Sequence, residues 1–242
     1  TTEIYTLSLH DALPISVTVT GVNDAVADGN VAYAVNLSAS SADANYQGRT
    51  GSVSVTNQDN DAAGITVGTP SGVSTSETGT SVTFTLILTS QPAASVTIPL
   101  SSNRPTEGTV SPASVVFTTA NWNVAQTVTV TGVDDFVADG TQGSTVVSAP
   151  ATSPDPSYNG LDPADLVFTN TDNDAAGLVA TPSTGLVTTE AGGTATFQLT
   201  LSSQPTQNVT VAIASSNTAE GTVLPASSPF TTANWNVAQT VT

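Results

Sequence analysis

Apolar and polar residues alternate along the stretch VTFTLIL at residues 82–88, whose apolar face is Val82, Phe84, Leu86 and Leu88. An alternation with a period of two residues is typical of a β-strand that buries one face. The stretch ATFQLTL at residues 195–201 keeps this pattern with Phe197, Leu199 and Leu201, although its polar residues differ. The pattern predicts a half-buried strand at both places.

Comparable short runs, bounded by Gly and Pro, predict further strands near residues 65–70, 95–101, 115–118, 125–133, 141–149 and 164–170. Threonine, valine, serine and alanine dominate the composition, whereas the helix-favouring residues lysine, arginine, methionine and glutamate are scarce. About seven strands within about 110 residues are typical of an immunoglobulin-like β-sandwich. We therefore predict an all-β fold.

The sequence also repeats itself over a domain-sized distance. The stretch TNQDNDAAG, which begins at residue 56, returns as TNTDNDAAG at residue 169, a shift of 169 − 56 = 113 positions. A period of this length indicates tandem domains, each with its own core. We predict one complete repeat at residues 65–177, the C-terminal part of a preceding repeat at 17–64 and the N-terminal part of a third at 178–242.

Residues 1–16 do not fit the repeat. The stretch TTEIYTLSLHDALPI resembles the translated end of a short-read sequencing adapter over residues 1–15. We interpret residues 1–16 as adapter-derived, exclude them from the fold, and expect the natural coding sequence to continue on both sides. His10, the only histidine, lies in this segment, so the rest of the sequence offers neither a Ser–His pair nor a His-based metal site. We expect no enzymatic activity.

The composition narrows the possible partners. The net charge is −17 and only Arg49 and Arg104 are basic, so the surface repels phosphate backbones and anionic lipids. Nucleic acid is therefore not an expected partner, and direct membrane insertion is not expected because the sequence has no run of about 18 apolar residues. The absence of cysteine excludes disulfides and thiolate metal sites.

The acidic residues recur at fixed places in predicted loops. Consecutive antiparallel strands reverse direction, so alternate loops meet at one end of a sandwich. In strand order A to G, that end receives the A–B loop, the C–D segment, the E–F loop and the exit from strand G. The acids placed there are Glu77, Glu107, Asp134, Asp135, Asp139, Asp172 and Asp174, with equivalents Asp24, Asp28, Asp59, Asp61 and Glu190 in the flanking pieces. Asp155 in the F–G loop is the exception.

Seven carboxylates at one end would repel one another strongly without a counter-charge. Calcium resolves this conflict, because it takes about 6 to 8 oxygen ligands and tolerates irregular loop geometry, whereas magnesium demands a tighter octahedron. Two calcium ions could share these carboxylates with loop carbonyls. The alternative is ordinary turn chemistry, since Asp, Asn and Gly are common turn formers, and this alternative is strongest for Glu107 and Asp155.

The repeat resembles the Calx-beta domain, through the stretches TSETGTSVTFTLILTSQP, FTTANWNVAQTVTVTGVDDFVADG and VFTNTDNDAAG. The resemblance covers most of residues 65–177 and both flanking pieces. It implies calcium at one tip, held by Glu77, by Asp134, Asp135 and Asp139 of the E–F loop, and by Asp172 and Asp174. The chain departs from the family at TEG (106–108) and VADG (137–140), where relatives often carry an Asp–Tyr pair and glutamates, which leaves the number of ions and their affinity open.

These observations predict a calcium-binding spacer, stiffened by the ion, in a large secreted or cell-surface bacterial protein of the adhesin kind. Its expected partners are the neighbouring repeats, with a cell-surface glycan or protein as a further class. The alternative is a carbohydrate- or protein-recognition module that uses the loop residues Trp122 and Trp235, although such a Trp more often closes the end of a core. Because both flanking pieces lack strands, we expect the chain to associate head to tail or to aggregate.

Overall fold

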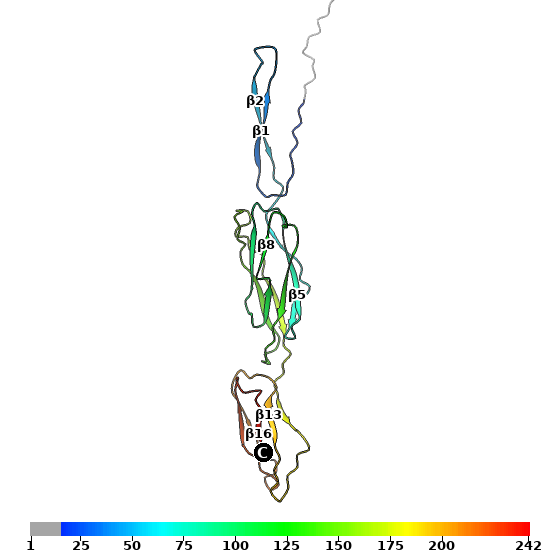
Figure 1. Cartoon of the computed structure of the whole chain (residues 1–242), viewed down its shortest axis with the longest axis vertical. Helices are drawn as coiled ribbons and strands as arrows, with labels where there is room; N and C mark the ends of the chain where they lie inside the picture. The colour runs from blue at the N-terminus through cyan, green and yellow to red at the C-terminus, as the bar shows by residue number, and fades with distance from the viewer. Residues whose placement is uncertain (1–15) are drawn as a thin grey trace, which may run out of the picture. The chain divides into compact units, whose positions relative to one another are not determined.

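The computed structural model describes residues 16–242, so His10 and all but the last residue of the segment interpreted as adapter-derived (1–16) lie outside the described part. The chain forms two compact units, which divide between Ala62 and Ala63. The first unit contains one antiparallel hairpin, made of β1 (Val31–Ser38) and β2 (Thr50–Asn57), in which Val31 pairs with Asn57 and Ser38 with Thr50 (Figure 1).

The second unit begins with a complete sandwich of two sheets. One sheet has the order β3 (Ile65–Val67), β5 (Ser81–Leu88), β9 (Gln126–Gly132) and β7 (Gly108–Ser111). The other has the order β4 (Ser74–Ser76), β11 (Leu166–Thr171), β10 (Gln142–Ser148), β6 (Val96–Ser102) and β8 (Ser114–Phe117). All neighbouring strands are antiparallel except β4 and β11, which run parallel.

The core lies between these two sheets. The alternating face predicted for β5 is buried along its whole length, and it packs with apolar residues of the facing sheet such as Ile98, Val146 and Phe168. Every strand predicted for this repeat is present. The structure adds two short strands, β4 and β7, which the alternation of the sequence does not mark. The prediction of an all-β, immunoglobulin-like sandwich is confirmed, and residues 16–242 contain no helix.

Residues 178–242 form a second, smaller cluster of strands. A three-stranded sheet contains β12 (Leu178–Thr181), β13 (Phe197–Leu201) and β16 (Gln239–Val241), and β14 (Val209–Ala212) pairs with β15 (Ser227–Phe230). Leu199, Leu201 and Phe230 form its core, as the alternation of residues 195–201 predicted for two of them. Along the described residues, no helix has the length and apolar character needed to cross a membrane.

Candidate metal centre

The parallel pair β4–β11 brings two distant acids together. Ser76 and Thr171 are partners at the ends of these strands, and because the strands run in the same direction, the next residues of both leave the sheet side by side. Those residues are Glu77 and Asp172, and the Glu77 N–H donates to the Thr171 carbonyl at 3.1 Å. Residues 169–174 then lead Asp174 to the same tip.

Three carboxylates meet at this tip. One oxygen each of Glu77, Asp172 and Asp174 lies within 4.8 Å of the other two. Glu77 is only 3% exposed. Both arginines of the described chain are engaged elsewhere, Arg104 with Glu107 and Arg49 through its Nε with the Asn45 carbonyl. The cluster is therefore a concentration of negative charge, and neither arginine of the described residues forms an ion pair with it.

Backbone N–H groups hold the cluster in shape. The Asp172 carboxylate accepts the Asp174 N–H and the Gly140 N–H, both at 2.6 Å, so this side chain ties the exit of β11 to the β9–β10 loop. The Asn173 N–H donates to Glu77 Oε2 at 3.0 Å. Gly140 has a φ of 76°, a left-handed conformation that favours glycine. Backbone N–H groups thus fix the carboxylates of Glu77 and Asp172, which also interact with each other.

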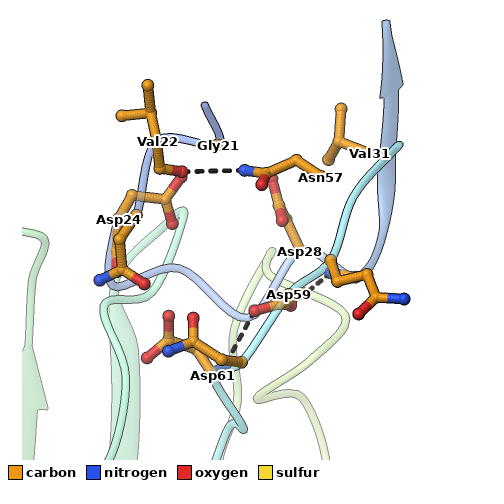
Figure 2. Close-up of a pocket in the computed structure, with 12 residues that line it drawn as sticks. Gly21, Val22, Asp24, Asp28, Val31, Asn57, Asp59 and Asp61 are labelled. Carbon is orange, nitrogen blue, oxygen red and sulfur yellow. Dashed lines mark hydrogen bonds between the residues drawn. The ribbon is translucent and has the colours of Figure 1, made fainter. Parts of the chain in front are cut away.

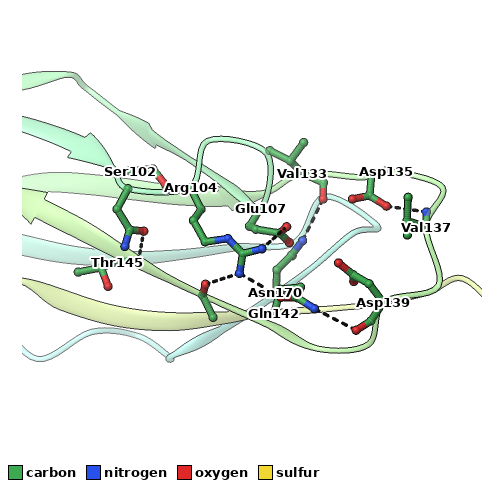
Figure 3. Close-up of polar contacts among 12 residues, drawn as sticks. Ser102, Arg104, Glu107, Val133, Asp135, Val137, Asp139, Gln142, Thr145 and Asn170 are labelled. Carbon is green, nitrogen blue, oxygen red and sulfur yellow. Dashed lines mark hydrogen bonds and ion pairs between the residues drawn. The ribbon is translucent and has the colours of Figure 1, made fainter. Parts of the chain in front are cut away.

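The β9–β10 loop contributes two more acids. Asp134 Oδ1 accepts a hydrogen bond from the Asn173 side chain at 3.1 Å. Asp135 Oδ1 accepts the Val137 N–H at 2.7 Å and closes a turn of the loop, as Figure 3 shows. Both carboxylates lie close enough to Asp174 to raise its pKa by charge repulsion. The structure therefore brings five of the seven predicted acids of this repeat to one place.

The pKa values of the cluster are pushed in opposite directions. Burial raises the pKa of Glu77, and the charges of Asp172 and Asp135 add to this effect. Burial and the charge of Asp172 likewise raise the pKa of Asp174. The backbone donors of Asp174 and Gly140 lower the pKa of Asp172. Asp174 Oδ2 is buried and has no hydrogen-bond partner within the described structure, which is costly for a carboxylate oxygen.

The preceding repeat carries part of the same arrangement of acids. Asp59 accepts the Gly29 N–H at 2.6 Å and the Asp61 N–H at 2.8 Å, and these bonds lower its pKa. Asp24 accepts the Val26 N–H at 2.9 Å, as Asp135 does for Val137. These side chains line a hollow of about 430 Å³, shown in Figure 2. Residues 17–64 contain no glutamate, so this copy has no equivalent of Glu77.

Glu107 has a different partner from the one predicted. It lies at the predicted end, since its carbonyl accepts the Val133 N–H at 3.1 Å. Its buried carboxylate, however, forms an ion pair with Arg104 at 3.2 Å, and Arg104 also donates to Gln142 Oε1 and the Gly143 carbonyl (Figure 3). Glu107 already has a counter-charge, which favours the alternative of a structural role, and it is not part of the three-carboxylate group.

The ion pair between Arg104 and Glu107 predicts a modest contribution to the free energy of unfolding. Replacing Arg104 by methionine is expected to lower the free energy of unfolding by about 1 to 2 kcal/mol, because it leaves a buried carboxylate unpaired. The effect stays below that of a fully buried pair, since the Arg104 side chain is 41% exposed. Urea unfolding measures it, with Arg49→Met as the matched control. An Arg104→Met variant as stable as the wild type would contradict a stabilising role for this ion pair.

Three further predicted ligands are not part of the three-carboxylate group. Asp139 and its equivalent Asp28 are exposed. The backbone N–H of Asp139 donates to the Val137 carbonyl, and that of Asp28 donates to the Val26 carbonyl. Glu190, the equivalent of Glu77, is exposed as well, and residues 178–242 contain no equivalents of Asp172 and Asp174. Asp155 is buried in the β10–β11 loop, where it accepts N–H groups of Ala93 and Ser157.

Other residues that support the site were not singled out from the sequence. Asn170 is buried, donates to the Val133 carbonyl at 2.9 Å and accepts from Thr75 Oγ1 at 3.1 Å. Its equivalent Asn57 donates to the Val22 carbonyl at 2.8 Å, the same bond in the other copy. The recurrence of this asparagine in both TN-x-DND stretches is the signal that could have identified it.

The two tryptophans pack against cores. Trp122 is partly buried against the core of the complete sandwich, and Trp235 against that of residues 178–242. Trp235 also contacts Phe136, with ring centroids 5.8 Å apart and ring planes at 41°. Partial burial against a core is the arrangement expected of a Trp that closes the end of a core.

The comparisons with known proteins do not assign the chain to a family. No family model and no curated protein sequence matches the chain. Among solved structures, SSP-19, an MSP-domain protein like family member in Caenorhabditis elegans, has 11% identity and a TM-score of 0.29, and the match covers 42% of this chain and 92% of that chain. Domains 4–9 of the surface layer protein SbsC have 14% identity and a TM-score of 0.28, over 71% of this chain and 26% of that chain. The chain thus spans about a quarter of the SbsC chain.

Proposed function

We propose that the complete repeat binds calcium through Glu77, Asp172 and Asp174, with Asp134 and Asp135 as further ligands at the same tip. The repeats would then serve as a calcium-stiffened spacer in a large secreted or cell-surface protein of the adhesin kind, in a structural rather than a catalytic role. The observation that carries this proposal is the buried, unpartnered Asp174 Oδ2 within a group of three converging carboxylates.

The spacing of the oxygens suits a cation of this size. Calcium–oxygen distances are about 2.3 to 2.6 Å, so two ligands on opposite sides of one ion lie about 4.8 Å apart. The three oxygens lie within 4.8 Å of one another. Carboxylates from irregular loops are typical calcium ligands, whereas the stricter octahedron of magnesium fits such loops less well. The resemblance to Calx-beta domains supports the same ion.

The stiffening role follows from where the ligands lie. Asp172 and Asp174 belong to DNDAAG, which leads directly into β12, so an ion bound there would restrict the linker. The β9–β10 loop already contacts the loop between β13 and β14, since the Gln204 N–H donates to the Phe136 carbonyl at 2.6 Å. Phe136 sits next to Asp135, so the loop that holds the ion also holds the next repeat.

The direct test is calorimetric melting of the full chain with calcium and with a chelator. A tenfold excess of free calcium over its dissociation constant is expected to stabilise the folded protein by about 1.4 kcal/mol per site. The melting temperature of the complete repeat should therefore rise by several degrees, and magnesium at the same ionic strength should produce a smaller rise. Identical melting curves in calcium and in chelator would remove the proposal.

The opposite pKa shifts lead to a pH prediction. The raised pKa values of Glu77 and Asp174 mean that the calcium-free folded state binds more protons than the unfolded chain above the ordinary carboxyl range. Its stability should therefore fall as pH rises through that range, so acidification from pH 7 towards about 5 should raise the melting temperature. The lowered pKa of Asp172 acts oppositely, but only below about pH 4.

Calcium should reverse this pH dependence, because it binds the deprotonated carboxylates and loses affinity as they take up protons. Melting temperatures measured at several pH values with and without calcium check both signs. A calcium-free melting temperature that falls steadily from pH 7 to about 5 would contradict the assignment of the raised pKa values.

A further inference from the structure

Phe136 is an apolar ring in the β9–β10 loop that its own repeat does not use. The side chain is 58% exposed and does not belong to the core of residues 65–177. The loop also closes without it. In the preceding repeat the Val26 N–H donates to Asp24 Oδ1 at 2.9 Å and forms the same turn, with Ala25 in place of the phenylalanine. The reason for an aromatic residue here therefore lies outside the loop.

The ring contacts residues 178–242 instead. Its centroid lies 5.8 Å from that of Trp235, with the ring planes at 41°, and attractive aromatic pairs have centroids about 4.5 to 7 Å apart. The Phe136 carbonyl accepts the Gln204 N–H at 2.6 Å. Gln204 Nε2 in turn donates at 2.8 Å to the Thr232 carbonyl, which belongs to the Trp235 loop. The ring and the carbonyl of Phe136 thus meet one surface, made of two connected loops.

This surface is built in the same way in both repeats that contain it. The Leu201 N–H donates to the Trp235 carbonyl at 2.9 Å, as the Leu88 N–H donates to the Trp122 carbonyl at 3.1 Å. In both copies the asparagine before the tryptophan accepts the backbone N–H of the threonine three residues earlier. The Trp235 loop therefore has the structure that it has in the complete sandwich.

The linker between repeats makes a contact of its own, and this contact is not specific to one junction. The Ser202 N–H donates to the Gly177 carbonyl at 3.0 Å, and the equivalent Thr89 N–H donates to the Gly64 carbonyl at 3.0 Å. The linker contact recurs from one repeat to the next, whereas the phenylalanine does not. Phe136 is thus the residue that can make one junction differ from another.

We infer that Phe136 docks on the Trp235 loop of the following repeat and holds the two repeats in one orientation. The aromatic pair is uncharged, so the contact needs no cation and acts independently of calcium at the neighbouring carboxylates. Ala25 has no ring, so the repeat of residues 17–64 lacks this contact. Successive junctions are therefore unequal. A junction after a phenylalanine is held by the ring, and one after an alanine depends on the linker and on calcium.

Pulsed electron–electron double resonance between two spin labels tests this inference on the full chain. The sequence has no cysteine, so Thr127→Cys and Thr240→Cys place labels at equivalent, exposed strand positions of the two repeats. In chelator the distance distribution should be narrow. Loss of an aromatic pair changes the docked-to-undocked ratio by roughly threefold to tenfold, so Phe136→Ala should broaden the distribution roughly twofold. Phe136→Tyr is the matched control, because it keeps the ring and should keep the narrow distribution.

The same labels in calcium separate this inference from the proposed function. Equal widths for the wild type and Phe136→Ala in chelator overturn the docking contact, even where calcium narrows both distributions and the calcium-stiffened spacer stands. A wild-type distribution that calcium leaves unchanged and Phe136→Ala broadens supports the contact and contradicts stiffening by calcium. Phe136→Ala should fold normally, because Ala25 closes the equivalent loop, and thermal melting of the variant checks this.

Discussion

Replacing Glu77 by glutamine is expected to weaken calcium binding roughly a hundredfold, because the site loses one of its three converging charges. The same change is expected to stabilise the calcium-free protein by about 1 kcal/mol. Glu77 is buried beside Asp172, and its pKa is raised, so without an ion its negative charge opposes folding. Glutamine keeps an oxygen that can accept the Asn173 N–H, and its amide can donate to Asp172.

Weaker calcium binding combined with higher calcium-free stability distinguishes a cation site from an ordinary acidic turn. If Glu77 only shaped the turn, its replacement would lower the stability with and without calcium alike. Titration calorimetry gives the affinity and thermal melting gives the stability. Glu190→Gln is the matched control, since it is the same change at the equivalent, exposed position of residues 178–242. An unchanged calcium affinity in Glu77→Gln would contradict the proposed site.

Replacing Gly132 by alanine is expected to lower the free energy of unfolding by about 3 kcal/mol, the upper part of the range for overpacked sites. An added Cβ would collide with the Ser76 carbonyl and lie 2.5 Å from Asn170 Oδ1. These atoms belong to β4 and β11, whose ends carry Glu77 and Asp172. β9 would have to move away from β4 and β11, which would displace Glu77 and Asp172, so calcium affinity should fall as well.

Gly108→Ala is the matched control for this change. Gly108 is the direct partner of Gly132 across β7 and β9, but its added Cβ would meet Ser144 Oγ only at 3.6 Å, an ordinary contact. Its free energy of unfolding should change by about 1 kcal/mol or less. Urea unfolding of the two variants provides the comparison, and equal effects would show that the close approach of β4 to β9 does not support the tip.

The strands with apolar alternation could be predicted, and those without it could not. Residues 82–88 carry a clear period of two because β5 buries one face. β4 and β7, with the sequences STS and GTVS, offer almost no apolar side chains. Their places are set by pairing with β11 and β9, which is a tertiary effect. β4 is nevertheless the strand that brings Glu77 next to Asp172.

The end of the sandwich at which the acids gather could be predicted from chain direction alone. Which acids face each other could not, because loop positions say nothing about side-chain partners. Glu107 illustrates the limit, since Arg104, three residues earlier, folds back on it. Asn170 illustrates another limit. From the sequence, a polar residue next to the acids is interpreted as part of a turn, whereas the structure shows it buried and hydrogen-bonded to Val133 and Thr75.

The most direct measurement is the crystal structure of the chain grown in calcium, with anomalous scattering used to locate the ion. The account predicts a calcium peak between Glu77, Asp172 and Asp174, with oxygens at about 2.3 to 2.6 Å and Asp174 Oδ2 among them. No peak at saturating calcium, with Glu77 and Asp174 turned apart or bonded to protein donors, would contradict it.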